Sequence, residues 1–279
     1  MPRRDARPSD RLLRSLLATA VELAEAAGAE LERRATRGPR RDVRRKGEGD
    51  FVTAVDVRLE RSIRREIAAR HPDHGFLGEE SGASRPDARF QWVIDPIDGT
   101  SNFAQGLPIY AVAVACLHDR DPIAAAVWSA PNAARFAAAR GLGAWFDGRR
   151  LRSGDLPLDD AAVVGAQWLR GAHESKLLRA LAASGARVRV FGSTVTQICD
   201  VAAGRLLANV QTQGRIWDVA APFLIAKEAG CSVTDWRGAP ILPFPDLATD
   251  RHYPSLIAPP RAHARLRELL RGPSARTRR

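Results

Sequence analysis

Three patterns in the sequence predict an α+β fold. Apolar residues recur at the three- and four-residue spacing of a helix over residues 8–36. Four short apolar runs between residues 111 and 146, separated by turn residues, are typical of an antiparallel sheet. After residue 175, helix-like and strand-like segments alternate. With 279 residues, 45% of them hydrophobic, the chain can fill one large core or two of modest size.

The first half of the chain is predicted to contain long helices followed by strands. Leucine and alanine define the first helix, and Ser9 and Asp10 are plausible caps for it. Residues 51–55 are expected to form either a short turn or the entry to the second helix, which ends near His71-Pro72. We expect helices at 8–36 and 58–69, and strands at 76–77, 92–94, 111–117, 123–128, 134–138 and 144–146.

The second half is predicted to alternate between helices and strands. A change in composition over residues 149–158 suggests a boundary between a domain at 1–150 and a domain at 151–279. Gly141 and Gly143 are expected to form a hairpin turn, since no helix follows them as it would in a phosphate-binding loop. We expect helices at 176–183, 194–203 and 219–229, with strands at 187–190 and 206–211.

The net charge of +11 is almost entirely due to arginine, because only three of the 43 basic residues are lysines. The arginines gather near both ends of the chain and over residues 40–46. Such runs could steer anionic substrates or bind nucleic acid, or they could reflect only a GC-rich genome. No aromatic residues interleave with them, so nucleic acid is not expected as a partner, although the Arg-rich tails leave it open.

Other features of composition favour a cytoplasmic protein over a membrane or secreted one. No apolar run approaches the roughly 20 residues that span a bilayer, and the first residues lack the apolar core of a signal peptide. The three cysteines are isolated, which favours reduced, buried thiols. The six histidines share no metal-ligand spacing.

The segment 92–103 carries the strongest chemical signal. A short apolar run ends at Asp95 and Asp98, and the residues from Gly99 onward suit a tight turn that opens a helix. Carboxylates at a strand end, beside free N–H groups at a helix start, can hold a divalent metal and a phosphate together. Taken alone, the segment could also be an ordinary turn in which Asp98 caps the helix.

Further acidic motifs favour the metal site over the ordinary turn. Glu79 and Glu80 follow an apolar pair, Asp218 begins a stretch of small residues, and Asp56 lies upstream. In this order and spacing, the motifs from Lys46 to residue 230 resemble the inositol monophosphatase family of magnesium-dependent phosphatases, within the fructose-1,6-bisphosphatase-like superfamily. The resemblance implies a layered α/β/α/β sandwich, a site in the cleft between the halves and a homodimer.

The same resemblance implies a role for each matched residue. Two or three Mg²⁺ ions would be held by Glu79, Asp95, the carbonyl of Ile97, Asp98 and Asp218. Thr100, Asp56 and Glu79 would serve catalysis by orienting the attacking water and moving its proton. Phosphate or substrate would contact Gly99, Thr100, Gly192, Ser193, Thr194 and Gln211, and Lys46 would lie on a metal-binding loop.

The substrate side departs from the family pattern. Gln211 occupies the position of a glutamate that contacts inositol, so it could contact a hydroxyl group, or it could be a solvent-facing strand residue without a ligand. We therefore expect hydrolysis of inositol monophosphate or a related sugar or polyol phosphate. Histidinol phosphate or 3′-phosphoadenosine 5′-phosphate is an alternative with the same chemistry. A non-catalytic basic scaffold that binds RNA or a transcription partner is a third hypothesis.

Overall fold

The computed structural model of the chain describes residues 8–35, 43–47, 50–130, 132–155, 157–167 and 179–271. The helices within this part are α1 (Asp10–Ala35), α2 (Ala54–Arg70), α3 (Thr100–Gln105), α5 (Thr194–Ala202), α6 (Ile216–Glu228) and α7 (Pro260–Arg271). A small hairpin is formed by β1 (Val43–Gly47) and β2 (Asp50–Thr53).

Two larger sheets organise the described residues. The first has the order β10-β9-β8-β7-β6-β5-β3-β4 and the second the order β12-β11-β13-β15-β14. The strands of the first sheet are β3 (Gly75–Gly78), β4 (Gly82–Ser84), β5 (Phe90–Asp98), β6 (Ala111–His118), β7 (Asp121–Ser129), β8 (Ala134–Ala139), β9 (Gly143–Phe146) and β10 (Arg149–Leu151). The strands of the second sheet are β11 (Val163–Ala166), β12 (Arg187–Arg189), β13 (Ala208–Gln211), β14 (Ser232–Thr234) and β15 (Ser255–Ala258).

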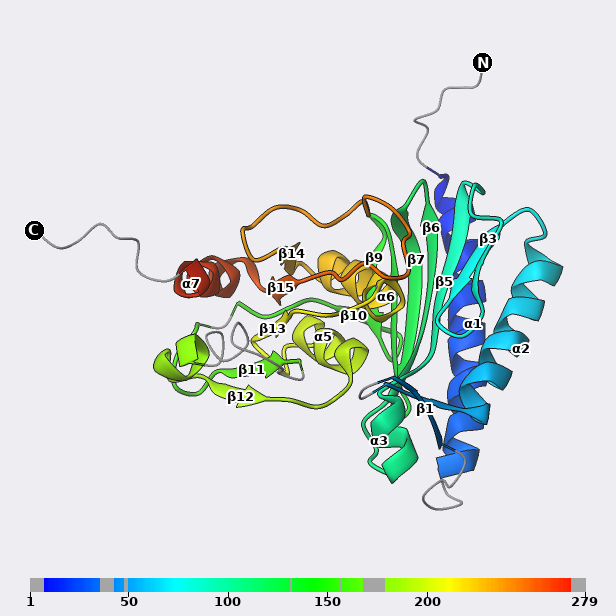
Figure 1. Ribbon diagram of the computed structural model, residues 1–279. Helices are drawn as coiled ribbons and strands as arrows, with labels where there is room; N and C mark the ends of the chain where they lie inside the picture. Colours follow the sequence, from blue (N-terminus) through cyan, green and yellow to red (C-terminus); the bar gives the residue numbers. More distant parts are fainter. Residues whose placement is uncertain are drawn as a thin grey trace, which may run out of the picture.

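Helices and sheets alternate in layers (Figure 1). Helices α1 and α2 cover one face of the first sheet, α5 and α6 lie between the two sheets, and α7 packs on the far side of the second. Strand β6 shows why such a layer needs an apolar sequence. Its odd-numbered residues from Ala111 to Leu117 pack toward α6, whereas Val112, Val114 and Cys116 pack toward α1. The layered fold expected from the sequence is confirmed, with α7 as an additional outer layer.

Most expected helices and central strands are present. Ser9 caps α1, because its hydroxyl oxygen accepts a hydrogen bond from the N–H of Leu12. Of the two alternatives at 51–55, the turn is wrong, since residues 50–53 pair with β1. The helix entry is confirmed at the end of the segment, because α2 starts at Ala54. Of the helix expected at 176–183, residues 179–183 are helical and the rest lies outside the described residues.

Several short strands and the last helix were not predicted. Strands β4, β10, β11, β14 and β15 have only three or four residues each, too few to show an alternating pattern. Helix α7 is rich in arginine and buries mainly Ala262 and Leu266. Its apolar stripe is therefore narrow, and the arginines obscure it in the sequence.

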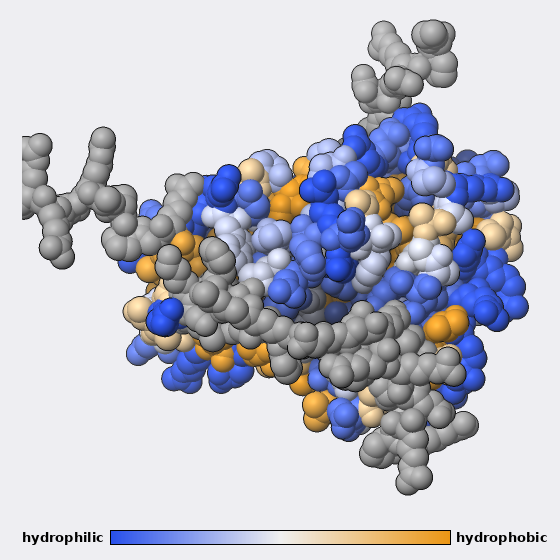
Figure 2. Space-filling view, in the orientation of Figure 1, coloured by the Kyte–Doolittle hydropathy of each residue, from blue (hydrophilic) through white to orange (hydrophobic). Residues whose placement is uncertain are grey.

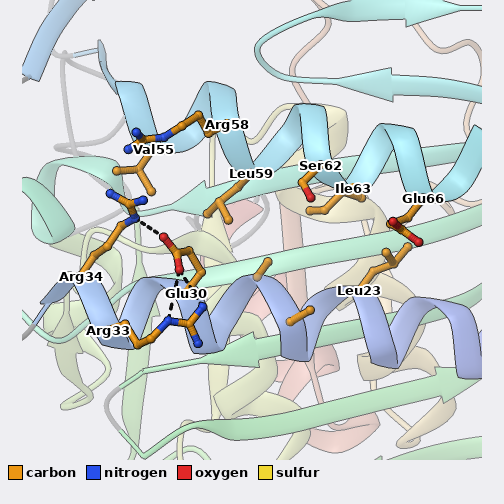
Figure 3. Close-up of a pocket in the computed structure, with 12 residues that line it drawn as sticks. Leu23, Glu30, Arg33, Arg34, Val55, Arg58, Leu59, Ser62, Ile63 and Glu66 are labelled. Carbon is orange, nitrogen blue, oxygen red and sulfur yellow. Dashed lines mark hydrogen bonds and ion pairs between the residues drawn. The ribbon is translucent and has the colours of Figure 1, made fainter.

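A groove of about 360 Å³ runs between α1 and α2 on the outer side of the first sheet (Figure 3). Leu23, Leu59 and Ile63 line its length, and Glu30 forms ion pairs with two arginines of α1 at one end. Asp56 and Glu60 of α2 are not among the lining residues although both are buried. Helix α2 therefore buries a second face, directed at the first sheet.

The outer surface shows no single large apolar area in the view of Figure 2. Hydrophilic residues cover most of that face, and the hydrophobic ones form small separate patches. Among the described helices, none has both the length and the apolar composition needed to span a bilayer.

Candidate active site

The two aspartates of segment 92–103 lie on the same face of the first sheet because β5 contains a bulge between them. Asp95 pairs with Ala113 and Asp98 pairs with Ala111, so an advance of three residues along β5 corresponds to an advance of two along β6. In a regular strand, residues three apart would point to opposite faces. The extra residue turns both carboxylates toward the layer that contains α6, and Pro96 is tolerated there because a bulge lacks regular ladder bonds.

Helix α6 brings the third carboxylate to this point. Asp218 lies in its first turn, where Oδ2 accepts a hydrogen bond of 2.7 Å from the N–H of Arg215. Asp95, Asp98 and Asp218 each offer an oxygen atom within 4.8 Å of the others. The first sheet and the following helical layer thus contribute jointly to one acidic cluster.

The cluster is electrostatically unfavourable without a cation. Burial raises the pKa of Asp95 well above its usual range, and the charges of Glu79 and Asp98 raise it further. Burial also raises the pKa of Asp218 to about 7, with the charge of Asp98 as the next cause. Asp95 Oδ2 is buried and accepts no hydrogen bond from any described residue. A buried oxygen that has no hydrogen-bond donor and lies among other carboxylates fits a hard divalent cation such as Mg²⁺.

Asp98 is held from the second half of the chain by the start of α5. Its carboxylate accepts hydrogen bonds from the Ser193 hydroxyl and from the N–H groups of Thr194 at 3.2 Å and Val195 at 2.9 Å. Burial raises the pKa of Asp98 to about 6, and these bonds oppose that rise because they favour the charged form. Ser193 and Thr194, expected at the substrate, thus bind a carboxylate of the cluster.

Asn102 also holds the first half of the chain to the segment before α5. Its Nδ2 donates to the carbonyl oxygens of Ile109 at 2.8 Å and Phe191 at 2.7 Å, which ties α3 to the residue before Gly192. Gly192 has a φ of +73°, and a Cβ there would lie 3.1 Å from Asn102 Nδ2. Gly192 therefore serves the close approach between the two halves, and its predicted substrate contact stays a prediction.

Thr100 and Asp56 come together beside the cluster. Thr100 Oγ1 lies 2.8 Å from the carbonyl oxygen of Ile97 and 3.4 Å from Asp56 Oδ1. Asp56 is fully buried on α2. Gly99 precedes α3 with a φ of +86°, and a Cβ there would lie 2.9 Å from the Ile109 carbonyl oxygen, so the turn requires glycine.

The remaining predicted residues lie outside the cluster of three aspartates or have side chains outside the described part of the structure. Glu79 follows β3 and its charge raises the pKa of Asp95, but it lies outside the group of three carboxylates within 4.8 Å. Lys46 lies in β1, and its side chain is outside the described part of the structure. Gln211 is in β13 and only 1% exposed, so the solvent-facing alternative is wrong.

One residue of this region was missed from the sequence. Glu60 is 1% exposed and accepts hydrogen bonds from the backbone N–H groups of Glu80 and Ser81. The available signal was its spacing, since Glu60 follows Asp56 by four residues and so shares its helix face. Two acidic residues four apart are also common on exposed helix faces, so only the folded structure shows that Glu60 is buried.

Comparisons with known proteins agree with this arrangement. The family model described as the inositol monophosphatase family matches residues 12–272. An inositol-1-monophosphatase of Mesorhizobium japonicum is 36% identical over 230 residues, which are 80% of this chain and 86% of that protein. A Nus factor SuhB of Xylella fastidiosa is 33% identical over 224 residues, 78% of this chain and 81% of that protein.

Solved structures give the same result. The crystal structure of extragenic suppressor protein SuhB from Bartonella henselae matches with a TM-score of 0.83 at 29% identity, covering 93% of this chain and 100% of that one. The inositol monophosphatase of Thermotoga maritima matches with a TM-score of 0.80 at 27% identity, covering 94% and 97% of the two chains. This chain belongs to the inositol monophosphatase family.

Proposed function

We propose that this protein hydrolyses a small phosphomonoester with Mg²⁺ and an activated water molecule. The observation that carries the proposal is the cluster of Asp95, Asp98 and Asp218, whose carboxylate oxygens lie within 4.8 Å of one another. Membership of the family supports phosphatase activity in general. Hydrolysis of phosphate monoesters is extremely slow without a catalyst, so a site of this concentrated charge suits it.

The ligands proposed for Mg²⁺ are the three aspartates together with Glu79 and the carbonyl oxygen of Ile97. All are oxygen donors, which Mg²⁺ prefers, and the described residues offer no histidine or cysteine in the cluster. Bound Mg²⁺ would offset the charge of the phosphate group and lower the pKa of a water molecule.

Thr100 is proposed to orient the attacking water, supported by Asp56. When the Thr100 hydroxyl donates to Asp56 Oδ1, its oxygen retains lone pairs that can accept a hydrogen bond from water. A proton leaving the water can then pass to Thr100 Oγ1 while the Thr100 proton passes to Asp56; Glu79 is the alternative acceptor. The backbone N–H groups of Gly99 and Thr100 are proposed to bind the phosphate oxygens.

The proposed substrate is inositol monophosphate or a related sugar or polyol phosphate. Relatives named inositol-1-monophosphatase support this class. Gln211 Oε1 is buried and has no hydrogen-bond partner among the described residues, so it can accept a bond from a substrate hydroxyl. Because Gln211 is neutral, histidinol phosphate or 3′-phosphoadenosine 5′-phosphate remains the alternative substrate.

Phosphate release from a panel of substrates tests the proposal. The panel contains inositol 1-phosphate, histidinol phosphate, 3′-phosphoadenosine 5′-phosphate, fructose 1,6-bisphosphate and glycerol 2-phosphate, each assayed with Mg²⁺ and with EDTA. We expect release only with Mg²⁺, and fastest from inositol 1-phosphate. Equal rates in EDTA would contradict the metal requirement, and no release from any substrate would contradict the proposed class.

A second candidate function is a non-catalytic role in binding RNA or a transcription partner. It is favoured by relatives named Nus factor SuhB and by the net charge of +11. Electrostatic binding of RNA predicts an affinity that falls steeply with salt and with removal of the Arg-rich ends. Affinity insensitive to both would exclude that role.

A homodimer is also proposed, on the family resemblance alone. Sedimentation equilibrium measures the mass of the protein in solution. A mass of twice 30.4 kDa is expected, and a mass of 30.4 kDa at all concentrations would contradict the proposal.

A further inference from the structure

We propose that Glu60 is a positioning residue that sets metal affinity by holding the turn that carries Glu79. This inference rests on the proposed function, because Glu79 matters here as a metal ligand. Glu60 itself does not reach the acidic cluster. It acts through the backbone of the two residues that follow Glu79.

The hydrogen bonds of Glu60 use both of its carboxylate oxygens. Oε2 accepts the N–H of Glu80 at 2.8 Å and Oε1 accepts the N–H of Ser81 at 2.7 Å. Two neighbouring backbone donors therefore meet two acceptors on a rigid planar group that is 1% exposed. Bonds to a charged acceptor are stronger than neutral ones, and burial protects them from competition with water.

Gly78 allows this close approach. A Cβ at residue 78 would lie 2.4 Å from the carboxyl carbon of Glu60, a distance that real Cβ atoms do not adopt. In the parallel pair of β3 and β5, Gly78 is opposite Ile94, the residue before Asp95. The turn therefore leaves the sheet where β5 reaches the acidic cluster, so its position controls how near Glu79 can come to Asp95.

Helix α2 contacts the site through a row of residues four apart. Asp56 lies 3.4 Å from Thr100 Oγ1, Glu60 holds the turn, and Arg64 NH1 lies 3.3 Å from the Ser81 hydroxyl. Residues four apart share one helix face, so a single rigid element supports both the water-orienting Thr100 and the Glu79 turn. This arrangement gives Glu60 a role beyond filling space under the sheet.

Replacement of Glu60 by glutamine tests the inference. Glu60→Gln keeps the shape but places an amide NH₂ against a backbone N–H, so one of the two bonds is lost. Residues that hold metal ligands in place typically change metal affinity 10- to 100-fold, and we expect Mn²⁺ binding to weaken roughly tenfold. Calorimetric titration with Mn²⁺ in the absence of substrate measures this directly.

Two further measurements separate positioning from a merely structural role. Phosphate release by Glu60→Gln should require more Mg²⁺ but recover most of its rate at saturating Mg²⁺. The matched control is Glu66→Gln, which removes an exposed carboxylate from the same helix and should leave Mn²⁺ binding unchanged. Unchanged Mn²⁺ affinity in folded Glu60→Gln, with only a lower unfolding temperature in EDTA, would overturn the inference.

A variant on the other side of the contact covers the case in which Glu60→Gln does not fold. Gly78→Ala leaves Glu60 intact and forces the carboxylate and the turn apart. It should weaken Mn²⁺ binding in the same direction, and unchanged binding would overturn the inference. If the wild-type protein binds no divalent cation, the proposed function fails first, whatever the variants do.

Discussion

The acidic cluster and the region around Gln211 differ in how their buried polar atoms are satisfied. Asp98 accepts three hydrogen bonds from the start of α5, and Asp218 accepts one from Arg215. Asp95 Oδ2 of the cluster has no partner among the described residues and lies between other carboxylates. Gln211 Oε1 and Ser255 Oγ, on residues paired across β13 and β15, also have no partner among the described residues, but both belong to neutral side chains. The unpartnered oxygen of the cluster therefore suits a cation, whereas those of the β13–β15 side suit a neutral hydrogen-bonding group.

The largest effect is expected from the centre of the cluster. Asp95→Asn removes one charge and one oxygen from the proposed metal site, where a bound metal would supply several kcal/mol of transition-state stabilisation. Phosphate release should fall about a thousandfold. The matched control is the exposed Asp73→Asn, which should retain the wild-type rate. A loss of less than tenfold for Asp95→Asn would place the chemistry elsewhere.

A smaller effect is expected at Thr100. Thr100→Ala removes the hydroxyl that lies between Ile97 and Asp56, and positioned proton transfer contributes roughly a hundredfold or more. We expect kcat to fall about a hundredfold with little change in Mn²⁺ affinity. Thr100→Ser keeps the hydroxyl and should recover most of the rate. An equal loss in both variants would show that the methyl group, not the hydroxyl, matters.

The stability of the metal-free protein should depend on pH through the cluster. The pKa values of Asp98, about 6, and Asp218, about 7, lie above those of an unfolded aspartate, so the folded state holds protons that the unfolded state releases. Their stabilising contribution is complete below pH 4 and is lost as the pH rises through 7. Between pH 5 and 8 in EDTA, the free energy of unfolding of Asp218→Asn should therefore decrease by about 2 kcal/mol less than that of the wild-type protein. Urea unfolding at each pH measures both. If the unfolding free energies of the two proteins changed equally with pH, that result would contradict repulsion between the carboxylates of the cluster.

The smallest effect is expected on the Gln211 side. Gln211→Glu restores a charged acceptor and should raise kcat/KM for inositol 1-phosphate a few-fold relative to glycerol 2-phosphate. The rate with p-nitrophenyl phosphate, which has no hydroxyl group on its leaving group's ring, serves as the control and should not change. An unaltered preference would remove Gln211 from substrate recognition.

Two of the three aspartates of the cluster lie in one local motif that the sequence marks well, whereas Asp218 comes from a distant motif on α6. Asp95, Asp98 and Thr100 lie within six residues, and the i, i+3 spacing of the aspartates becomes meaningful once the bulge is seen. Strands β6 and β7 are long and mostly apolar, so their positions were also predictable. The short strands β4, β10, β11, β14 and β15 and the Arg-rich α7 were not, because each is too short or too weakly apolar to give a clear pattern.

Other contacts could not be predicted from the sequence because they join distant segments. Asp98 accepts the N–H groups of Thr194 and Val195 from the second half of the chain, and Glu60 accepts those of Glu80 and Ser81 in the turn after β3. The donors in these contacts are backbone N–H groups, which nearly every residue type has, so the residue types do not reveal them. The burial of Gln211 likewise depends on β15 and Trp236, whose indole donates to the carbonyl oxygens of Gln211 and Ser255.

The central claim is that the three aspartates bind the metal on which phosphate release depends. The most direct measurement titrates metal-free protein with Mn²⁺ and follows heat and, in parallel samples, phosphate release from inositol 1-phosphate. We predict that binding and activity rise together in the wild-type protein and that Asp95→Asn loses both. Phosphate release at full rate without bound metal, or undiminished Mn²⁺ binding by Asp95→Asn, would contradict the account.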